Sequence, residues 1–294
     1  MHTHRHLGHR VVAALPVVLM LSGCGETGPA ATTSTTAAPT TAAPAATRPS
    51  VAPAPADPVW HYEGEEGPAN WGKLSPKFAT CGAGRAQSPI DIVNPASGAD
   101  PGVTMQFAPA ALRIAHHTHV ADGINNGHTI QVNYEGGDTL TIGADKFELV
   151  QYHFHNRSEH TVKGAHFPME MHLVHKSAAG KLAVIGVFIE SGAHNVAFDP
   201  IWGNLPKAKG EETHYPSVQV DVDALLPKNR TSYRYDGSLT TPPCTEGVKW
   251  IVMTTPIQLS AGQISEFTAL IHDNNRTPQP LNGRAIATDV IGTR

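Results

Sequence analysis

Histidines at alternate positions in two nearby stretches constrain this chain more than any other feature of its sequence. Gln151, His153 and His155 stand two residues apart, and so do Glu170 and His172. In a β-strand, side chains at alternate positions point to the same face of the sheet. If the two stretches are strands that pair antiparallel, three imidazoles meet on one face.

Three imidazoles with a fourth position open form the ligand pattern of catalytic zinc, whereas structural zinc sites are closed by four protein ligands. The predicted ligands are His153, His155 and His172. Gln151 and Glu170 share the faces of these ligands, and we expect each to bind the second ring N–H of a neighbouring histidine and fix its orientation. The alternative is a solvent-facing strand. That would explain an H-x-H pair among 18 histidines, but not the third histidine beside a carboxylate.

Short runs of alternating apolar and polar residues recur through the chain and predict a mainly β fold. The expected strands are residues 105–107, 112–120, 128–134, 139–143, 147–155, 169–175, 182–190, 232–235 and 249–253. The predicted architecture is a single mainly β (α+β) domain with a large twisted, mostly antiparallel central sheet and a few short peripheral helices. Residues 200–206 are expected to form a short helix or turn. The best helix candidate is residues 260–272, which Ser260 would cap.

The N-terminal segment has the features of an export signal. Arg5 and Arg10 precede an apolar run, residues 11–21, that is too short to span a bilayer. The four residues ending at Cys24 (LSGC) resemble a bacterial lipobox, in which the cysteine after the cleavage site carries lipid. We therefore expect residues 1–23 to be a signal peptide and Cys24 to be lipidated. The alternative is an ordinary secretory peptide that contains a cysteine.

A Thr/Ala/Pro-rich tract, residues 24–58, follows the signal and has too few large apolar side chains to offset the entropy of folding. We expect a disordered tether that holds the folded catalytic domain, residues 59–294, off a membrane. The expected location is the cell surface or periplasm, with a secreted soluble protein as the alternative. A net charge of −4 argues against nucleic acid as a partner. No obligate protein partner is expected. Contact with a membrane is expected only through the lipid on Cys24.

Five separated motifs occur in a fixed order along the folded part of the chain. They are Gln87–Ile92, Asn125–His128, Gln151–His155 with Ser158–His160, Glu170–Val174, and Ser238–Pro243 with Trp250 after it. With these motifs the chain resembles the alpha-class carbonic anhydrases, over about Trp60 to Arg284. The resemblance implies a zinc enzyme that reversibly hydrates carbon dioxide to bicarbonate and a proton by way of zinc-bound hydroxide.

The resemblance also implies a role for each matching residue. His128 matches the proton shuttle, although taken alone after Asn-Gly it would be read as a turn residue. Thr240 matches the hydroxyl that accepts a hydrogen bond from the hydroxide, and Glu159 matches the carboxylate that accepts the proton of Thr240. The positions that match the substrate pocket are Thr241, Val174, Val184, Leu239 and Trp250. Those that match the water network are Tyr62, Asn126 and Gln131.

The chemistry gives independent reasons for these residue types. Three neutral imidazoles leave zinc its full double charge, which lowers the pKa of bound water from about 15.7 to about 7. An apolar pocket suits carbon dioxide, which is small and uncharged. A histidine side chain, with an ordinary pKa near 6.5, suits the transfer of the released proton to solvent.

The remaining cysteines form an even pair if Cys24 carries lipid. Cys81 and Cys244 are then expected to pair in an exported protein, with two buried thiols as the alternative. The resemblance implies the same disulfide. It also implies cis peptide bonds at Ser88-Pro89 and at Pro242-Pro243.

Two other functions fit parts of the pattern. Some relatives of the family have lost zinc ligands and serve as binding modules, but all three ligand histidines are present here. In a cupin-like protein, Glu159 would join His153 and His155 as a metal ligand, but the glycines that flank such a motif are absent. A second metal site at His116, His117 and His119 lacks a carboxylate or cysteine partner, so a solvated strand is favoured there.

Overall fold

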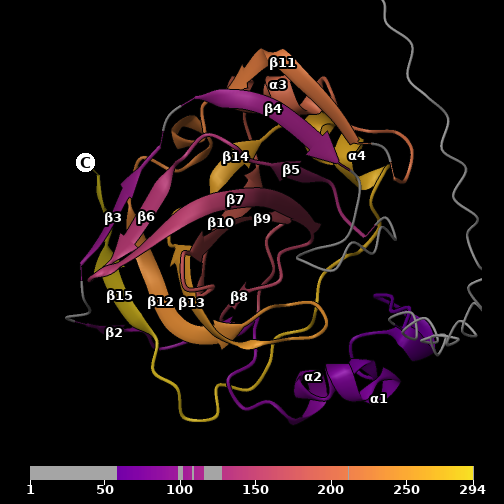
Figure 1. Ribbon diagram of the computed structural model, residues 1–294, viewed down its shortest axis with the longest axis vertical. Coiled ribbons are helices and arrows are strands. Elements are labelled where there is room, and N and C mark those ends of the chain that lie inside the picture. The colour runs from indigo at the N-terminus through magenta and orange to yellow at the C-terminus, as the bar shows by residue number, and fades with distance from the viewer. Residues whose placement is uncertain (1–57, 99–101, 108, 116–127, 211, 294) are drawn as a thin grey trace, which may run out of the picture. The chain divides into compact units, whose positions relative to one another are not determined.

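A long sheet of mostly antiparallel strands forms the centre of the fold (Figure 1). The computed structural model describes residues 58–98, 102–107, 109–115, 128–210 and 212–293, all within the unit Pro55–Arg294. The predictions for the signal peptide, Cys24, Asn126 and residues 116–120 lie outside the described residues. The described strands lie side by side in the order β11 (Glu212–Val220), β4 (Ala110–Ala115), β5 (Gln131–Asn133), β7 (Asp145–Asn156), β9 (Met169–Ser177), β10 (Leu182–Ser191), β13 (Glu246–Met253), β12 (Thr231–Ser238), β15 (Ala287–Val290) and β2 (Ala96–Ser97).

Shorter elements surround this path. β3 (Val103–Gln106) pairs with β6 (Thr139–Ile142) and with β16 (Gly292–Thr293), while β14 (Ile257–Leu259) pairs with β10. β1 (Asp91–Ile92) and β8 (Thr161–Val162) form a separate two-stranded ribbon. The helices are short: η1 (Gly64–Glu66), α1 (Trp71–Leu74), η2 (Pro76–Phe78), α2 (Thr80–Ala83), η3 (Val196–Phe198), α3 (Asp199–Trp202), η4 (Asp223–Leu225) and α4 (Ala261–Thr268). The predicted fold class is confirmed.

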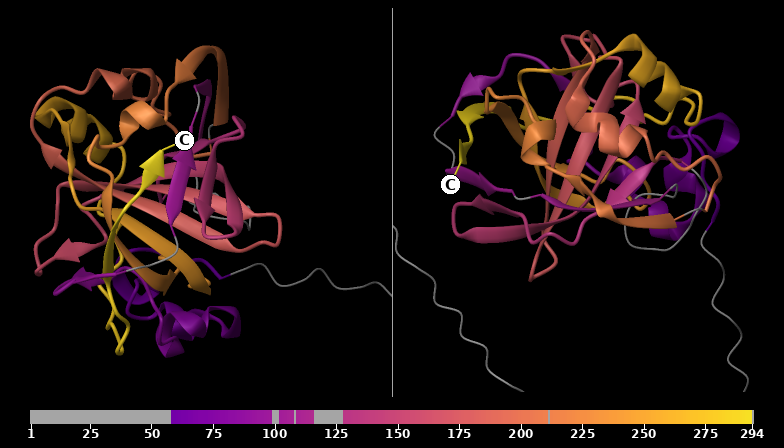
Figure 2. Two further views of the ribbon diagram at one scale, coloured as in Figure 1. Left: turned by 90° about the vertical axis from the view of Figure 1, so that its left-hand side faces the viewer. Right: turned by 90° about the horizontal axis from the view of Figure 1, so that it is seen from above.

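Strict alternation gives the central strands two different faces. On β9, Met171 and Leu173 belong to the large core, whereas Val174 belongs to a second cluster on the other face. The large core also takes up Trp202 of α3 and Phe267 of α4. Two further views show how strongly the central strands twist (Figure 2). Both faces of β9 are therefore covered, which is why its middle residues are buried regardless of parity.

Several element predictions differ from the structure: besides β11, the strands β2, β8, β14, β15 and β16 were not expected. No strand was expected at β11, where Pro216 interrupts the pattern; the structure accommodates it at a register shift between Tyr215 and Gln219 in the pairing with β4. The helix predicted to reach residue 272 ends at Thr268, and just after it the N–H groups of Leu270 and Ile271 both bind Phe267 O. Its predicted start is confirmed, with Ser260 and Gln263 forming a capping box.

Long-range links tie the first helices to the sheet. The predicted disulfide is present between Cys81, on α2, and Cys244, between β12 and β13. Figure 1 shows α1 and α2 near this end of the β12–β13 pair and away from α3 and α4. The predicted cis bonds at Ser88-Pro89 and Pro242-Pro243 are also present. Among the described helices, none has the length and apolar composition needed to cross a membrane.

Candidate metal centre and its pocket

Pairing of β7 with β9 brings the three predicted ligands together. His153 lies directly opposite His172 in the antiparallel register, and His155 lies opposite Glu170. The imidazole centroids of His153, His155 and His172 are 4.6 to 5.3 Å apart. One ring nitrogen from each lies within 4.8 Å of the others. A tetrahedral zinc ion with Zn–N distances of about 2.0–2.1 Å would hold these nitrogens about 3.3 Å apart, which lies inside that limit.

Each of these rings is oriented by a hydrogen bond through one nitrogen. His153 Nδ1 binds Gln151 Oε1 at 2.7 Å, and His155 Nδ1 binds Asn274 O at 2.7 Å. His172 uses its other nitrogen, with Nε2 at 2.9 Å from Glu170 Oε1. The second nitrogen of each ring is the one that a metal ion would take. Gln151 and Glu170 thus occupy the supporting positions expected from the sequence.

Burial disfavours the charged form of a histidine, and the neutral form is the one that binds metal. His155 is fully buried, and burial together with the charge of His172 lowers its pKa to about 3. Among the described residues, this cluster and an overlapping one of His160, Glu170 and His172 are the groups that could hold a metal. The overlapping cluster is already tied by hydrogen bonds, so the three histidines are the better ligand set.

Glu170 is a buried carboxylate with four partners. It accepts hydrogen bonds from the rings of His160 and His172 and from the backbone N–H groups of Glu159 and His160. Burial alone would raise its pKa, but the charges and hydrogen bonds of His160 and His172 hold the pKa well below its usual range. A Cβ at Gly186 would lie 2.9 Å from Glu170 Oε1, so glycine at that position lets β10 approach the carboxylate.

Glu159 lies on the other side of the ligand set. It accepts hydrogen bonds from the Thr240 hydroxyl and from the backbone N–H of Arg276, and its Oε2 lies 3.5 Å from His155 Nε2. Burial raises the pKa of Glu159 to about 7, while His172, Arg276 and Thr240 oppose that rise. A divalent cation held by the imidazoles would favour the ionised carboxylate further.

A small cavity opens directly beside the imidazoles. Its volume is about 20 Å³, room for a molecule of a few atoms. It is lined by His153, His172, Val174, Val184, Leu239, Thr240, Thr241 and Trp250. The substrate-pocket residues expected from the sequence are therefore brought together in one place, with Val174, Val184 and Trp250 in the second apolar cluster.

Known proteins with the same sequence pattern and fold identify the family. The sequence model of eukaryotic-type carbonic anhydrases matches residues 66–290. A carbonic anhydrase of Klebsiella pneumoniae is 45% identical over 234 residues, which cover 77% of this chain and 89% of the relative. A carbonic anhydrase of Nostoc sp. is 42% identical over 241 residues, which cover 80% of this chain and 88% of the relative. The chain belongs to the alpha-class carbonic anhydrase family. It is an enzyme whose family reaction is the hydration of carbon dioxide.

Solved structures of this family share the fold. The alpha-carbonic anhydrase of Thermovibrio ammonificans, in complex with the inhibitor sulfanilamide, superposes with a TM-score of 0.73 at 40% identity, covering 79% of this chain and all of that one. The cupin alternative is therefore wrong, because a carbonic anhydrase sheet rather than a cupin barrel presents the histidines.

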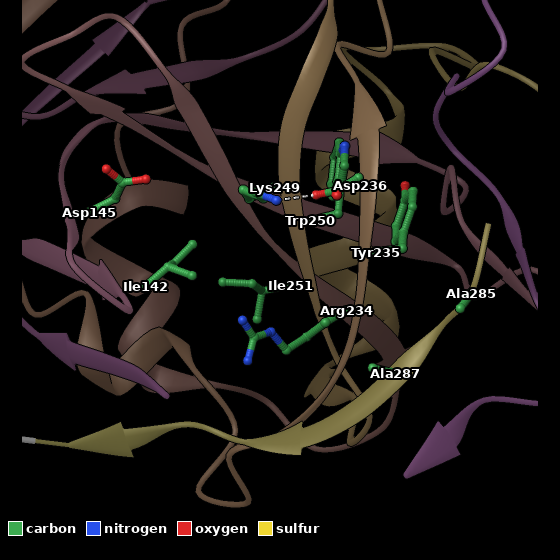
Figure 3. A pocket seen from close by; sticks show the side chains of 10 residues that line it. All are labelled: Ile142, Asp145, Arg234, Tyr235, Asp236, Lys249, Trp250, Ile251, Ala285 and Ala287. Atoms are coloured by element: carbon green, nitrogen blue, oxygen red, sulfur yellow. Dashed lines mark ion pairs between the residues drawn. The ribbon is translucent and has the colours of Figure 1, made fainter. Parts of the chain in front are cut away.

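A larger cavity of about 360 Å³ lies against β12 and β13 and is less suited to this chemistry (Figure 3). Figure 3 shows Arg234 and Ile251 lying close together and Lys249 joined to Asp236. Lys249 pairs with Asp236 at 2.7 Å, and Arg234 pairs with Asp289 at 2.7 Å. Its basic side chains are thus engaged by carboxylates, and none of the three ligand histidines lines it.

Several residues of the site carry no role in the sequence-based prediction. His160 links Glu170 to Tyr235, whose hydroxyl lies 2.6 Å from His160 Nε2 and donates in turn to Ser88 Oγ. The buried Arg276 donates from its guanidinium to Gln87 Oε1, Ser88 O and Cys81 O. The motif containing His160 was visible in the sequence, but nothing in the chain order signals the contacts of Arg276.

The raised pKa of Glu159 predicts a pH-dependent stability in the metal-free protein. The folded state holds this proton up to about pH 7, the unfolded chain only to about 4.5. The stabilising contribution is therefore complete at low pH and is lost as pH rises through this window. Relative to Glu159→Gln, the metal-free wild type should lose about 3 kcal/mol of unfolding free energy across it. Urea unfolding of both proteins at several pH values measures this; a difference independent of pH would contradict it.

Proposed function

We propose that the chain hydrates carbon dioxide to bicarbonate and a proton at a zinc ion held by His153, His155 and His172, and that His128 passes the proton to solvent. What supports the proposal is the cluster of three buried imidazoles, each oriented through one nitrogen, in a fold whose relatives are named carbonic anhydrases. When bound, zinc lowers the pKa of water to about 7 and so supplies a nucleophile at neutral pH.

Thr240 and Glu159 orient the attacking oxygen. The Thr240 hydroxyl donates a hydrogen bond to Glu159, so its oxygen can act only as an acceptor toward the nucleophile. A nucleophile whose own proton points to Thr240 presents a lone pair in a fixed direction. Arg276 N–H holds Glu159 Oε1 at 2.8 Å, which fixes the carboxylate in turn.

The apolar wall binds the substrate by excluding water rather than by charge. Val174, Val184 and Trp250 are each at most 3% exposed and line the same cavity as Thr241. Trp250 is fixed by its Nε1–H, which donates to Ser238 O at 2.9 Å. Carbon dioxide loses little hydration on entering such a pocket, whereas the bicarbonate formed there is charged and favours departure to solvent.

Proton release uses polar groups on the side of the site that includes β5. His128, Tyr62 Oη and Gln131 Oε1 supply buried polar atoms with no hydrogen-bond partner among the described residues, and for His128 that atom is Nδ1. Ordered water is the usual partner of such atoms. This supports a water path to His128, which carries a proton as a general base does. Asn126, assigned to the same path from the sequence, lies outside the described residues.

Removal of one ligand tests the metal assignment. His172→Ala should abolish both zinc content and carbon dioxide hydration, because two imidazoles cannot hold the ion in a tetrahedral site. Zinc is measured by atomic absorption, and hydration by stopped flow with metal-free and zinc-restored protein. Zinc retained at full occupancy would mean that the ligand set is wrong.

The matched control is His175→Leu on the same strand. His175 is also fully buried, but its parity places it away from the ligand face, and its Nδ1 binds Leu173 O. This variant should keep stoichiometric zinc and hydration activity. Loss of zinc from both variants would show that general destabilisation of β9, rather than ligation, is being measured.

Removal of the shuttle should slow turnover only when buffer is scarce. His128→Ala should lower kcat in dilute buffer by about 10-fold or more, since a positioned proton-transfer group contributes about 100-fold or more. Added imidazole should restore the rate by carrying the proton itself. An unchanged rate in dilute buffer would remove the assignment.

We also propose that the enzyme is exported and anchored by lipid at Cys24, on the strength of the apolar N-terminal run and the LSGC sequence. Cys24→Ala should release the protein from the membrane fraction, because the thiol that would carry the lipid is lost. The measurement is the partition of the protein between membranes and the soluble fraction in its host. Persistent membrane association of the variant would refute the lipid anchor and leave the secretory alternative to be tested.

A further inference from the structure

A second histidine stands beside the proposed shuttle. His61 Nδ1 lies 3.3 Å from His128 Nε2, and the ring centroids are 5.5 Å apart in an edge-to-face arrangement. The two residues are 67 positions apart in the sequence. At this distance the two rings form a hydrogen bond when either His61 Nδ1 or His128 Nε2, but not both, carries a proton.

His61 connects the buried ring to solvent. His128 is 8% exposed, whereas the side chain of His61 is 48% exposed. The second nitrogen of His61, Nε2, lies 3.5 Å from Glu66 Oε2, and the Glu66 side chain is half exposed. The buried His128 thus adjoins a side chain, His61, that is about half exposed to water, as is its own neighbour Glu66.

His128 is held in place while its two nitrogens face different surroundings. Its ring packs on Trp60, at 4.0 Å between centroids, and its backbone oxygen accepts a hydrogen bond from Asn274. Nδ1 is buried without a partner among the described residues, and Nε2 faces His61. Imidazole can take a proton at one nitrogen while it gives one up at the other, so a fixed ring can pass a proton on.

The surroundings of His128 disfavour its protonated form. Burial, then the positive charges of His61 and Lys209, lower the pKa of His128 to about 3. His128, His61 and Lys209 line a cavity of about 540 Å³. Its other charged or titratable lining groups are those of Tyr62, Glu63, His272 and Asp273. A shuttle that holds a proton this weakly benefits from an acceptor already within reach.

We propose that His61 is the second member of a two-imidazole relay, taking the proton from His128 and releasing it beside Glu66. A proton arrives at His128 Nδ1 as another leaves from Nε2 to His61 Nδ1. The proton on His61 Nε2 then leaves to Glu66 or to water. Both rings end with the same number of protons, with the tautomers exchanged. This relay rests on the proposed function, since it extends the role given there to His128.

The test compares turnover of the zinc-loaded enzyme in dilute and concentrated buffer. His61→Gln should lower kcat about 3- to 10-fold in dilute buffer and leave kcat/KM unchanged, since proton release follows the reaction with carbon dioxide. Concentrated buffer or added imidazole should remove the difference. Glu66→Gln should show a smaller loss of the same kind. The control His272→Gln, which changes another exposed imidazole of the same cavity, should behave as wild type.

A double variant separates failure of the relay from failure of the shuttle. If His61 acts through His128, then His61→Gln should cause no further loss in a His128→Ala background. Normal kcat for His61→Gln beside a slow His128→Ala would overturn the relay alone, as would losses that multiply in the double variant. Normal kcat in dilute buffer for His128→Ala would overturn both the shuttle and the relay.

Discussion

The antiparallel register between β7 and β9 is the constraint on which the rest of this site depends. It sets His153 opposite His172 and His155 opposite Glu170, so that ligands and supporting groups share one face. A slip of one residue would turn the imidazoles into the large apolar core and expose Met171 and its neighbours on the ligand face. The same alternation that buries the core therefore also fixes the arrangement of the three candidate ligands.

The two buried carboxylates, Glu159 and Glu170, differ in pKa because their surroundings differ. Glu170 has four hydrogen-bond donors beside it, two of them imidazole rings, and these favour its ionised form. Glu159 has fewer donors, and burial dominates its pKa. Glu170 is thus ionised and accepts hydrogen bonds from His172 and His160 whether or not a metal is bound. The ionised form of Glu159, in contrast, is favoured when a cation lies nearby. The separation of their pKa values by environment is the usual way that neighbouring acids take different roles.

The sequence predicts those parts of the structure that periodicity encodes. The strands carrying His153 and His172, the shared faces of Gln151 and Glu170, and the cap at Ser260 all follow from local spacing. Local spacing says nothing about partners distant in the chain. β11 was missed because Pro216 obscures its pattern and because an edge strand needs no strong alternation. The ligand positions were inferred from local pattern, whereas the pocket residues could be assigned only through family resemblance.

One short segment shows what only the folded chain could reveal. Asn274 O orients the ring of His155, while its side chain donates to His128 O and Phe154 O. Two residues further on, Arg276 N–H holds Glu159, and the Arg276 guanidinium reaches back to the N-terminal part of the domain. A loop from the C-terminal part of the chain thus touches a ligand, the proposed shuttle and the acceptor for Thr240. The loop therefore positions groups from distant parts of the sequence relative to one another, although it supplies none of the three candidate ligands itself.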